Sequence, residues 1–93
     1  MRVMEIAALV ARDYGITREQ LLSRRRRFAR PRQVVMYLAS LDPAKTYTQI
    51  ARELRMDHTT IIYGAAAIEE KASQDAVLGR SIYRLKEEIE ERS

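Results

Sequence analysis

Asp57-His58-Thr59-Thr60 is the stretch of this sequence with the clearest hydrogen-bonding chemistry. Asp57 is a good helix N-cap, because its carboxylate can accept from the backbone N–H of Thr59 or Thr60. The apolar residues that follow recur at helical spacing, at Ile61, Ala65 and Ile68. A helix that begins in this way exposes polar groups and a methyl group at its N-terminal end. A recognition helix offers such an end to base edges in the DNA major groove.

A block of positive charge precedes this stretch. Six arginines lie within nine residues, at Arg24, Arg25, Arg26, Arg27, Arg30 and Arg32. Residues 1–40 carry nine arginines and three acidic residues, whereas residues 69–93 carry five basic and seven acidic residues. Guanidinium groups this close repel one another unless an anion lies against them, and phosphate is the obvious anion. Such a run can also be a solvated or disordered face, but its place between two expected helices favours a fixed anion-binding loop.

Helices are expected along the whole chain. Apolar spacing and helix-ending residues predict six of them, over about residues 2–13, 18–22, 31–41, 46–54, 57–72 and 75–91. Gly15 ends the first helix, and Thr17 forms a capping box with Gln20 at the second. Pro31 is the expected first residue of the third helix. A tight turn at Arg55-Met56 joins the fourth and fifth helices, which is a helix-turn-helix pattern.

The expected core comes from the apolar faces of these helices. In the second and third helices it includes Leu21, Leu22, Val34, Val35, Leu38 and Leu41. The last helix has an apolar seam at Val77, Leu78, Ile82, Leu85 and Ile89. The sequence shows no alternation typical of strands. The prediction is an all-α fold in one domain, residues 1–93.

Composition argues against several classes of protein. No apolar run approaches the roughly 20 residues that span a bilayer, so a cytoplasmic protein without membrane contact is expected. The chain has no cysteine and a single histidine, His58, with no carboxylate pair or nucleophile at a workable spacing. That residue set argues against an enzyme, a metal site, a cofactor or a small-molecule substrate.

Two motifs carry a resemblance to a known family. Leu21-Leu22-Ser23, the arginine-rich loop and Ala29-Arg30-Pro31-Arg32-Gln33 come first, and Asp57-His58-Thr59-Thr60 follows at a matching distance. In this order they resemble the C-terminal DNA-binding domain, domain IV, of the bacterial replication initiator DnaA. The resemblance covers nearly the whole chain. It implies a helix-turn-helix fold similar to that of the Trp repressor and the DnaA C-terminal domain. No Gly-x-x-x-x-Gly-Lys-Ser/Thr motif of an ATPase is present in the sequence.

The resemblance also implies roles for particular residues. Asp57, His58 and Thr59 are expected to read base edges in the major groove of double-stranded DNA. One arginine of the loop Arg24, Arg25, Arg26 and Arg27 is expected to enter the neighbouring minor groove, and which one is open. The residues expected to bind phosphate are Arg30, Arg32, Gln33, Thr48 and Thr60. The implied function is sequence-specific DNA binding in transcriptional regulation or replication-origin control, in a bacterium or a phage.

Two features differ from the family pattern. The arginine loop is about two residues shorter, and Arg55-Met56 stands where the family usually has a turn that contains glycine. An alternative function is a protein–protein interaction module that dimerises or docks on a replication or transcription factor through the last helix. The oligomeric state is open, with a monomer favoured.

Overall fold

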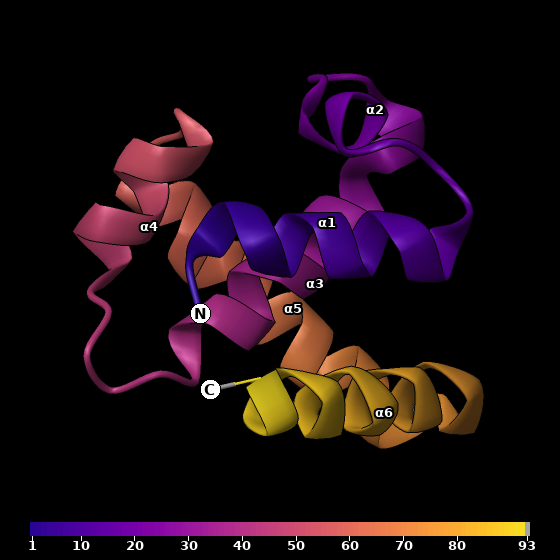
Figure 1. Cartoon of the computed structure of the whole chain (residues 1–93). Helices are drawn as coiled ribbons and strands as arrows, with labels where there is room; N and C mark the ends of the chain where they lie inside the picture. Colours follow the sequence, from indigo (N-terminus) through magenta and orange to yellow (C-terminus); the bar gives the residue numbers. More distant parts are fainter. Residues whose placement is uncertain (93) are drawn as a thin grey trace.

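This computed structural model describes residues 1–92, which contain six α-helices and one short 3₁₀ helix. Figure 1 shows how the helices are arranged. In chain order the elements are α1 (Val3–Tyr14), α2 (Arg18–Leu22), η1 (Arg26–Phe28), α3 (Ala29–Ser40), α4 (Tyr47–Leu54), α5 (His58–Gln74) and α6 (Ala76–Arg92). No strand occurs within these residues. The predicted all-α fold with six helices is therefore confirmed.

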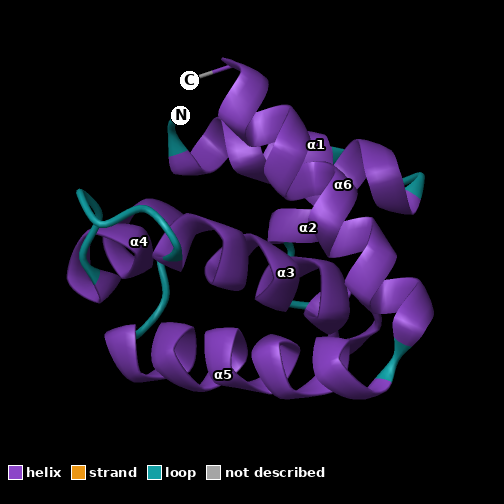
Figure 2. Cartoon of the chain, turned by 90° about the horizontal axis from the view of Figure 1, so that it is seen from below, coloured by secondary structure: helices purple, strands orange, loops and turns teal. Residues whose placement is uncertain are grey.

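Helix α3 lies at the centre, with α1 on one side and α5 on the other (Figure 2). It buries Val34, Val35 and Leu38 between them. Gly64 on α5 lets the two helices approach closely, because a Cβ atom there would lie 2.3 Å from the sulfur of Met36. The packing of α5 on α3 fixes where the first turn of α5 lies.

Capping residues set the ends of the shorter helices. Thr17 Oγ1 accepts a hydrogen bond from Gln20 N at 3.0 Å, and the Gln20 side chain accepts one from Thr17 N at 2.9 Å. This confirms the predicted capping box of α2. Thr46 and Gln49 form the same arrangement at α4. Gly15 ends α1 in the left-handed region, with φ of 69°.

Helix α6 packs against α1 through its apolar seam. Leu78, Ile82 and Leu85 are buried, as predicted. The contact also has a polar edge, where Asp13 accepts hydrogen bonds from Arg84 at 2.5 Å and from Ser81 at 2.7 Å. The predicted seam therefore belongs to the core of this chain.

Several details of the sequence prediction are wrong. Helix α3 begins at Ala29, so Pro31 is its third residue, where a missing N–H is also tolerated. Leu41 is 44% exposed because α3 has ended before it. Val77 is 69% exposed, since it precedes the buried Leu78 on α6 and points to a different face. Leu22 is only half-buried and packs on the edge of the core.

Candidate nucleic-acid interface

Helices α4 and α5 form the predicted helix-turn-helix, and the turn between them closes without glycine. Arg55 takes the left-handed conformation, with φ of 56° and ψ of 48°, and Met56 N donates to Ala51 O at 2.9 Å. A residue with a Cβ atom costs roughly 1–2 kcal/mol in this region. Arg55 therefore occupies a position at which glycine would have the lowest conformational energy.

The first turn of α5 exposes the polar stretch. The Asp57 side chain is 71% exposed and that of His58 is 60% exposed. Asp57 is at the N-cap position, where its carbonyl oxygen accepts from Thr60 N at 3.0 Å. The prediction that its carboxylate accepts a hydrogen bond from the amide of Thr59 or Thr60 is wrong. The carboxylate turns instead toward the imidazole of His58, with 3.4 Å between Asp57 Oδ1 and His58 Nδ1.

As a consequence, the N-terminus of α5 differs from those of α2 and α4. The side chains of Thr17 and Thr46 cap those two helices. The backbone N–H groups of His58 and Thr59 have no hydrogen-bond acceptor within the described part of the chain. Donors of this kind, at the positive end of a helix dipole, attract anions.

Side chains of the arginine loop and of α3 connect the loop to the rest of the domain. The Arg24 guanidinium donates to the carbonyl oxygen of Arg55, in the turn of the helix-turn-helix. Arg32, on α3, donates to the carbonyl oxygen of Ser23 at the start of the loop. Phe28 is buried at the other end of the loop, with the Arg27 guanidinium 5.1 Å from the centre of its ring. These contacts join the run of arginines to the turn before α5, to α3 and to the buried Phe28.

One groove brings the two motifs together. It has a volume of about 770 Å³. Its lining includes the loop and α3 residues Arg24, Arg32 and Gln33, and the α5 residues Asp57, Thr60 and Tyr63. Burial lowers the pKa of Arg32, and the charge of Arg24 lowers it further. Two guanidinium groups that repel each other in this way make the groove favourable for an anion.

The sequence matches a family of known function. Residues 3–68 match the model described as the bacterial DnaA protein helix-turn-helix. The chain belongs to the DnaA helix-turn-helix family. Residues 3–68 are therefore a DnaA-type DNA-binding helix-turn-helix domain.

Chromosomal replication initiator proteins named DnaA are similar to it along almost all of its length. The proteins from Agrobacterium fabrum and Nitrobacter hamburgensis are each 36% identical over 94 residues, and one from Rhodopseudomonas palustris is 37% identical. Each of these alignments covers 98% of this chain. The chain spans about a fifth of the length of these curated relatives.

In this DnaA-type domain the expected DNA-binding residues fall into three places. Those that line the groove are Arg24, Arg32, Gln33, Asp57 and Thr60. Those that are exposed outside it are Arg25, Arg26, Arg27, Thr48, His58 and Thr59. Arg30 lies beside Gln33 in an adjoining hollow of about 350 Å³.

Two residues of this surface were not expected from the sequence to contact DNA. Tyr63 is 71% exposed and lines the groove one helical turn after Thr59. Lys71 lines the hollow beside Arg30. Their positions three and eleven residues after Thr60 on the same helix were the available signal, because residues on one helix face recur at such intervals.

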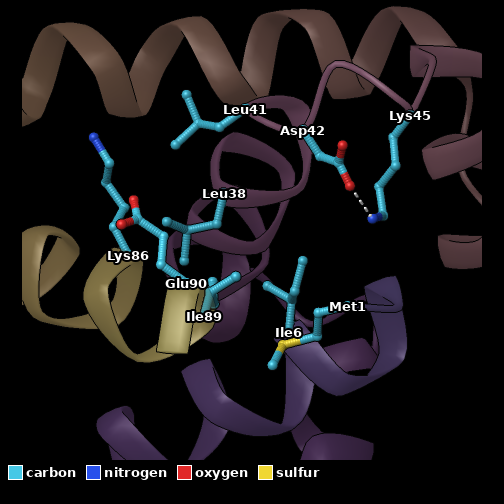
Figure 3. Close-up of a pocket in the computed structure, with 9 residues that line it drawn as sticks. All are labelled: Met1, Ile6, Leu38, Leu41, Asp42, Lys45, Lys86, Ile89 and Glu90. Atoms are coloured by element: carbon cyan, nitrogen blue, oxygen red, sulfur yellow. Dashed lines mark hydrogen bonds and ion pairs between the residues drawn. The ribbon is translucent and has the colours of Figure 1, made fainter. Parts of the chain in front are cut away.

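A second cavity of the DnaA-type domain lies apart from these residues (Figure 3). Its volume is about 360 Å³. Ile6, Leu38 and Ile89 form an apolar wall, and Lys45 pairs with Asp42 at 2.7 Å on the rim. None of the expected DNA-binding residues line it. The cavity therefore adds nothing to the candidate interface.

Two features are absent from residues 1–92 of the DnaA-type domain. No cluster of three or more histidine or acidic side chains there could hold a metal ion. Within the same residues, no helix is both long and apolar enough to cross a membrane.

Proposed function

We propose that residues 1–93 act as one domain that binds double-stranded DNA at specific sequences. The N-terminal turn of α5 enters the major groove, and the arginine loop reaches the adjacent minor groove. The observation that carries this proposal is the groove in which Arg24 and Arg32 lie beside Asp57 and Thr60. Cations that hold phosphate and side chains that read bases are needed side by side at such an interface.

The first turn of α5 supplies the chemistry for base reading. The Asp57 carboxylate can accept from the N4 amino group of cytosine. The Thr59 methyl group can contact the methyl group of thymine, and the His58 imidazole can donate to a purine acceptor or accept from an amino group. All three side chains are exposed, so base contact requires no unfolding.

The surrounding residues supply phosphate contacts. Arg30, Arg32, Gln33, Thr48 and Thr60 are proposed to bind the DNA backbone, together with the open amides of α5. Replacing Arg32 with alanine should weaken binding to every sequence about equally and lower the salt slope by about one. Because Arg32 also donates to Ser23, this variant should lose stability as well, so binding has to be measured well below its melting temperature.

The relatives suggest the setting. They are named chromosomal replication initiator proteins, and we propose that this domain acts on replication-origin or promoter DNA in the cytoplasm, at the nucleoid. Docking through the last helix is not favoured, because Leu78, Ile82 and Leu85 are buried within the chain.

Selection of bound duplexes from a random DNA pool tests the proposal. We expect an enriched motif, and a wild-type affinity for it at least about a thousandfold above that for a random duplex at the same salt. A motif without two-fold symmetry would indicate binding by a monomer. Recovery of unenriched DNA at physiological salt would contradict sequence-specific binding.

A further inference from the structure

The four consecutive arginines of the loop are not equivalent. Arg24 donates to the carbonyl oxygen of Arg55, which lies 31 residues further along the chain. This hydrogen bond joins the loop to the turn between α4 and α5, and Asp57 follows that turn by one residue. The side chain of Arg24 thus fixes the distance between the loop and the base-reading end of α5.

Two more contacts hold the ends of the loop. Arg32 donates to Ser23 at the beginning, and Phe28 is buried at the end. Arg27 lies over the Phe28 ring, and Phe28 N donates to the carbonyl oxygen of Arg25 at 3.1 Å. The backbone between Ser23 and Phe28 therefore has a defined course.

Arg25 and Arg26 are left with no contact of this kind. Both side chains are exposed, and within the described residues neither guanidinium has a hydrogen-bond, ion-pair or ring partner. A guanidinium without a partner can enter a narrow A·T-rich minor groove, where the negative potential is enhanced, without first breaking a contact in the protein.

We propose that Arg24 is a positioning residue and that Arg25 or Arg26 makes the minor-groove contact. The inference rests on the proposed function and assigns separate roles within the loop. The Arg24 hydrogen bond holds the loop at the spacing that lets one domain contact both grooves at once. Arg24 affects the minor-groove contact indirectly, because it sets the position of Arg25 and Arg26.

The test compares two versions of the selected duplex. In one, 2,6-diaminopurine replaces adenine at the minor-groove site, which adds an amino group there and leaves the major-groove edge of the base unchanged. The measured quantity is the discrimination ratio, defined as the affinity for the adenine duplex divided by that for the diaminopurine duplex. Wild-type protein should give a ratio of about ten or more.

The variants separate the roles of the arginines. Either Arg25→Ala or Arg26→Ala should bring the ratio close to one. Arg24→Ala should give an intermediate ratio, and adding it to the Arg25→Ala, Arg26→Ala double variant should leave that variant's ratio unchanged. Arg80→Ala, on the far end of the chain, removes one exposed positive charge and should keep the wild-type ratio. Thermal unfolding of each variant confirms that it is folded at the binding temperature.

Four outcomes would contradict the proposals. A ratio near one for Arg24→Ala, with Arg25→Ala and Arg26→Ala unchanged, would make Arg24 itself the reader and overturn the inference. A full wild-type ratio for Arg24→Ala would show that it positions nothing. A wild-type protein that binds the selected duplex specifically, yet with a ratio of one, would remove the minor-groove contact altogether. Failure of wild type to prefer the selected duplex over random DNA would instead contradict the proposed function.

Discussion

Asp57 Oδ1 lies 3.4 Å from His58 Nδ1, and the carboxylate accepts no hydrogen bond from the amides of α5. Two exposed side chains at the start of α5 therefore face each other. Asp57 could in principle both cap the helix and contact DNA. In this arrangement its carboxylate does not cap the helix and is exposed for contact with DNA.

The first prediction concerns the stability that Asp57 provides. At high salt, where attraction to the helix dipole is screened, Asp57→Ala should cost less than about 0.5 kcal/mol of unfolding free energy. The control is Thr46→Ala, which removes a capping hydrogen bond at α4 and should cost about 1 kcal/mol. Denaturant unfolding measures both values. Equal losses would show that the Asp57 carboxylate caps α5 in solution.

A second prediction follows from the left-handed conformation of Arg55. Arg55→Gly should raise the free energy of unfolding by about 1 kcal/mol, because glycine adopts this conformation without a steric penalty. For a domain of this size the melting temperature should rise by about 4–8 °C. Arg55→Ala loses the same charge but keeps the Cβ atom, so its melting temperature should stay near that of wild type. A glycine variant that melts no higher than the alanine variant would refute the assigned strain.

The third prediction concerns pH and the contact between α1 and α6. Burial raises the pKa of Asp13, but hydrogen bonds from Arg84 and Ser81 outweigh it, and the net result is a lowered pKa. A carboxyl group with a lowered folded-state pKa stabilises the protein above its unfolded pKa, and this stability is lost as the pH falls through the folded pKa. Asp13→Asn should therefore cost about 1 kcal/mol at pH 7.

The pH profile separates this effect from a general loss of packing. The difference between wild type and Asp13→Asn should shrink as the pH falls below the ordinary aspartate value of 3.8. A difference that stays constant from pH 7 down through the acid range would rule out the ion pair as its source.

Much of the fold could be predicted from the sequence because its signals are local. Apolar spacing and end residues such as Gly15 and Thr17 are enough to place helices along the chain. The predictions that Leu41 and Val77 are buried were wrong. Burial at a helix end depends on which neighbouring helix packs there, and the apolar spacing in the sequence continues past the last residue that is packed.

The candidate site was predictable in its residue types, and less so in its contacts. The two motifs indicated which side chains should meet, and the groove brings several of them together. The link from Arg24 to Arg55 spans 31 residues and uses a backbone carbonyl oxygen, which no side-chain pattern reveals. The orientation of the Asp57 carboxylate could not be predicted either. An aspartate at this position can cap α5 or turn toward His58, and the sequence is the same in both cases.

The central claim is that the first turn of α5 reads DNA sequence, and the affinities of His58→Ala and Thr59→Ala test it most directly. Each variant should lose roughly 1–3 kcal/mol of binding free energy on the selected duplex and almost none on random duplex at the same salt. Arg80→Ala serves as the control for unrelated surface change. Equal losses on the selected and random duplexes would contradict base reading by this turn.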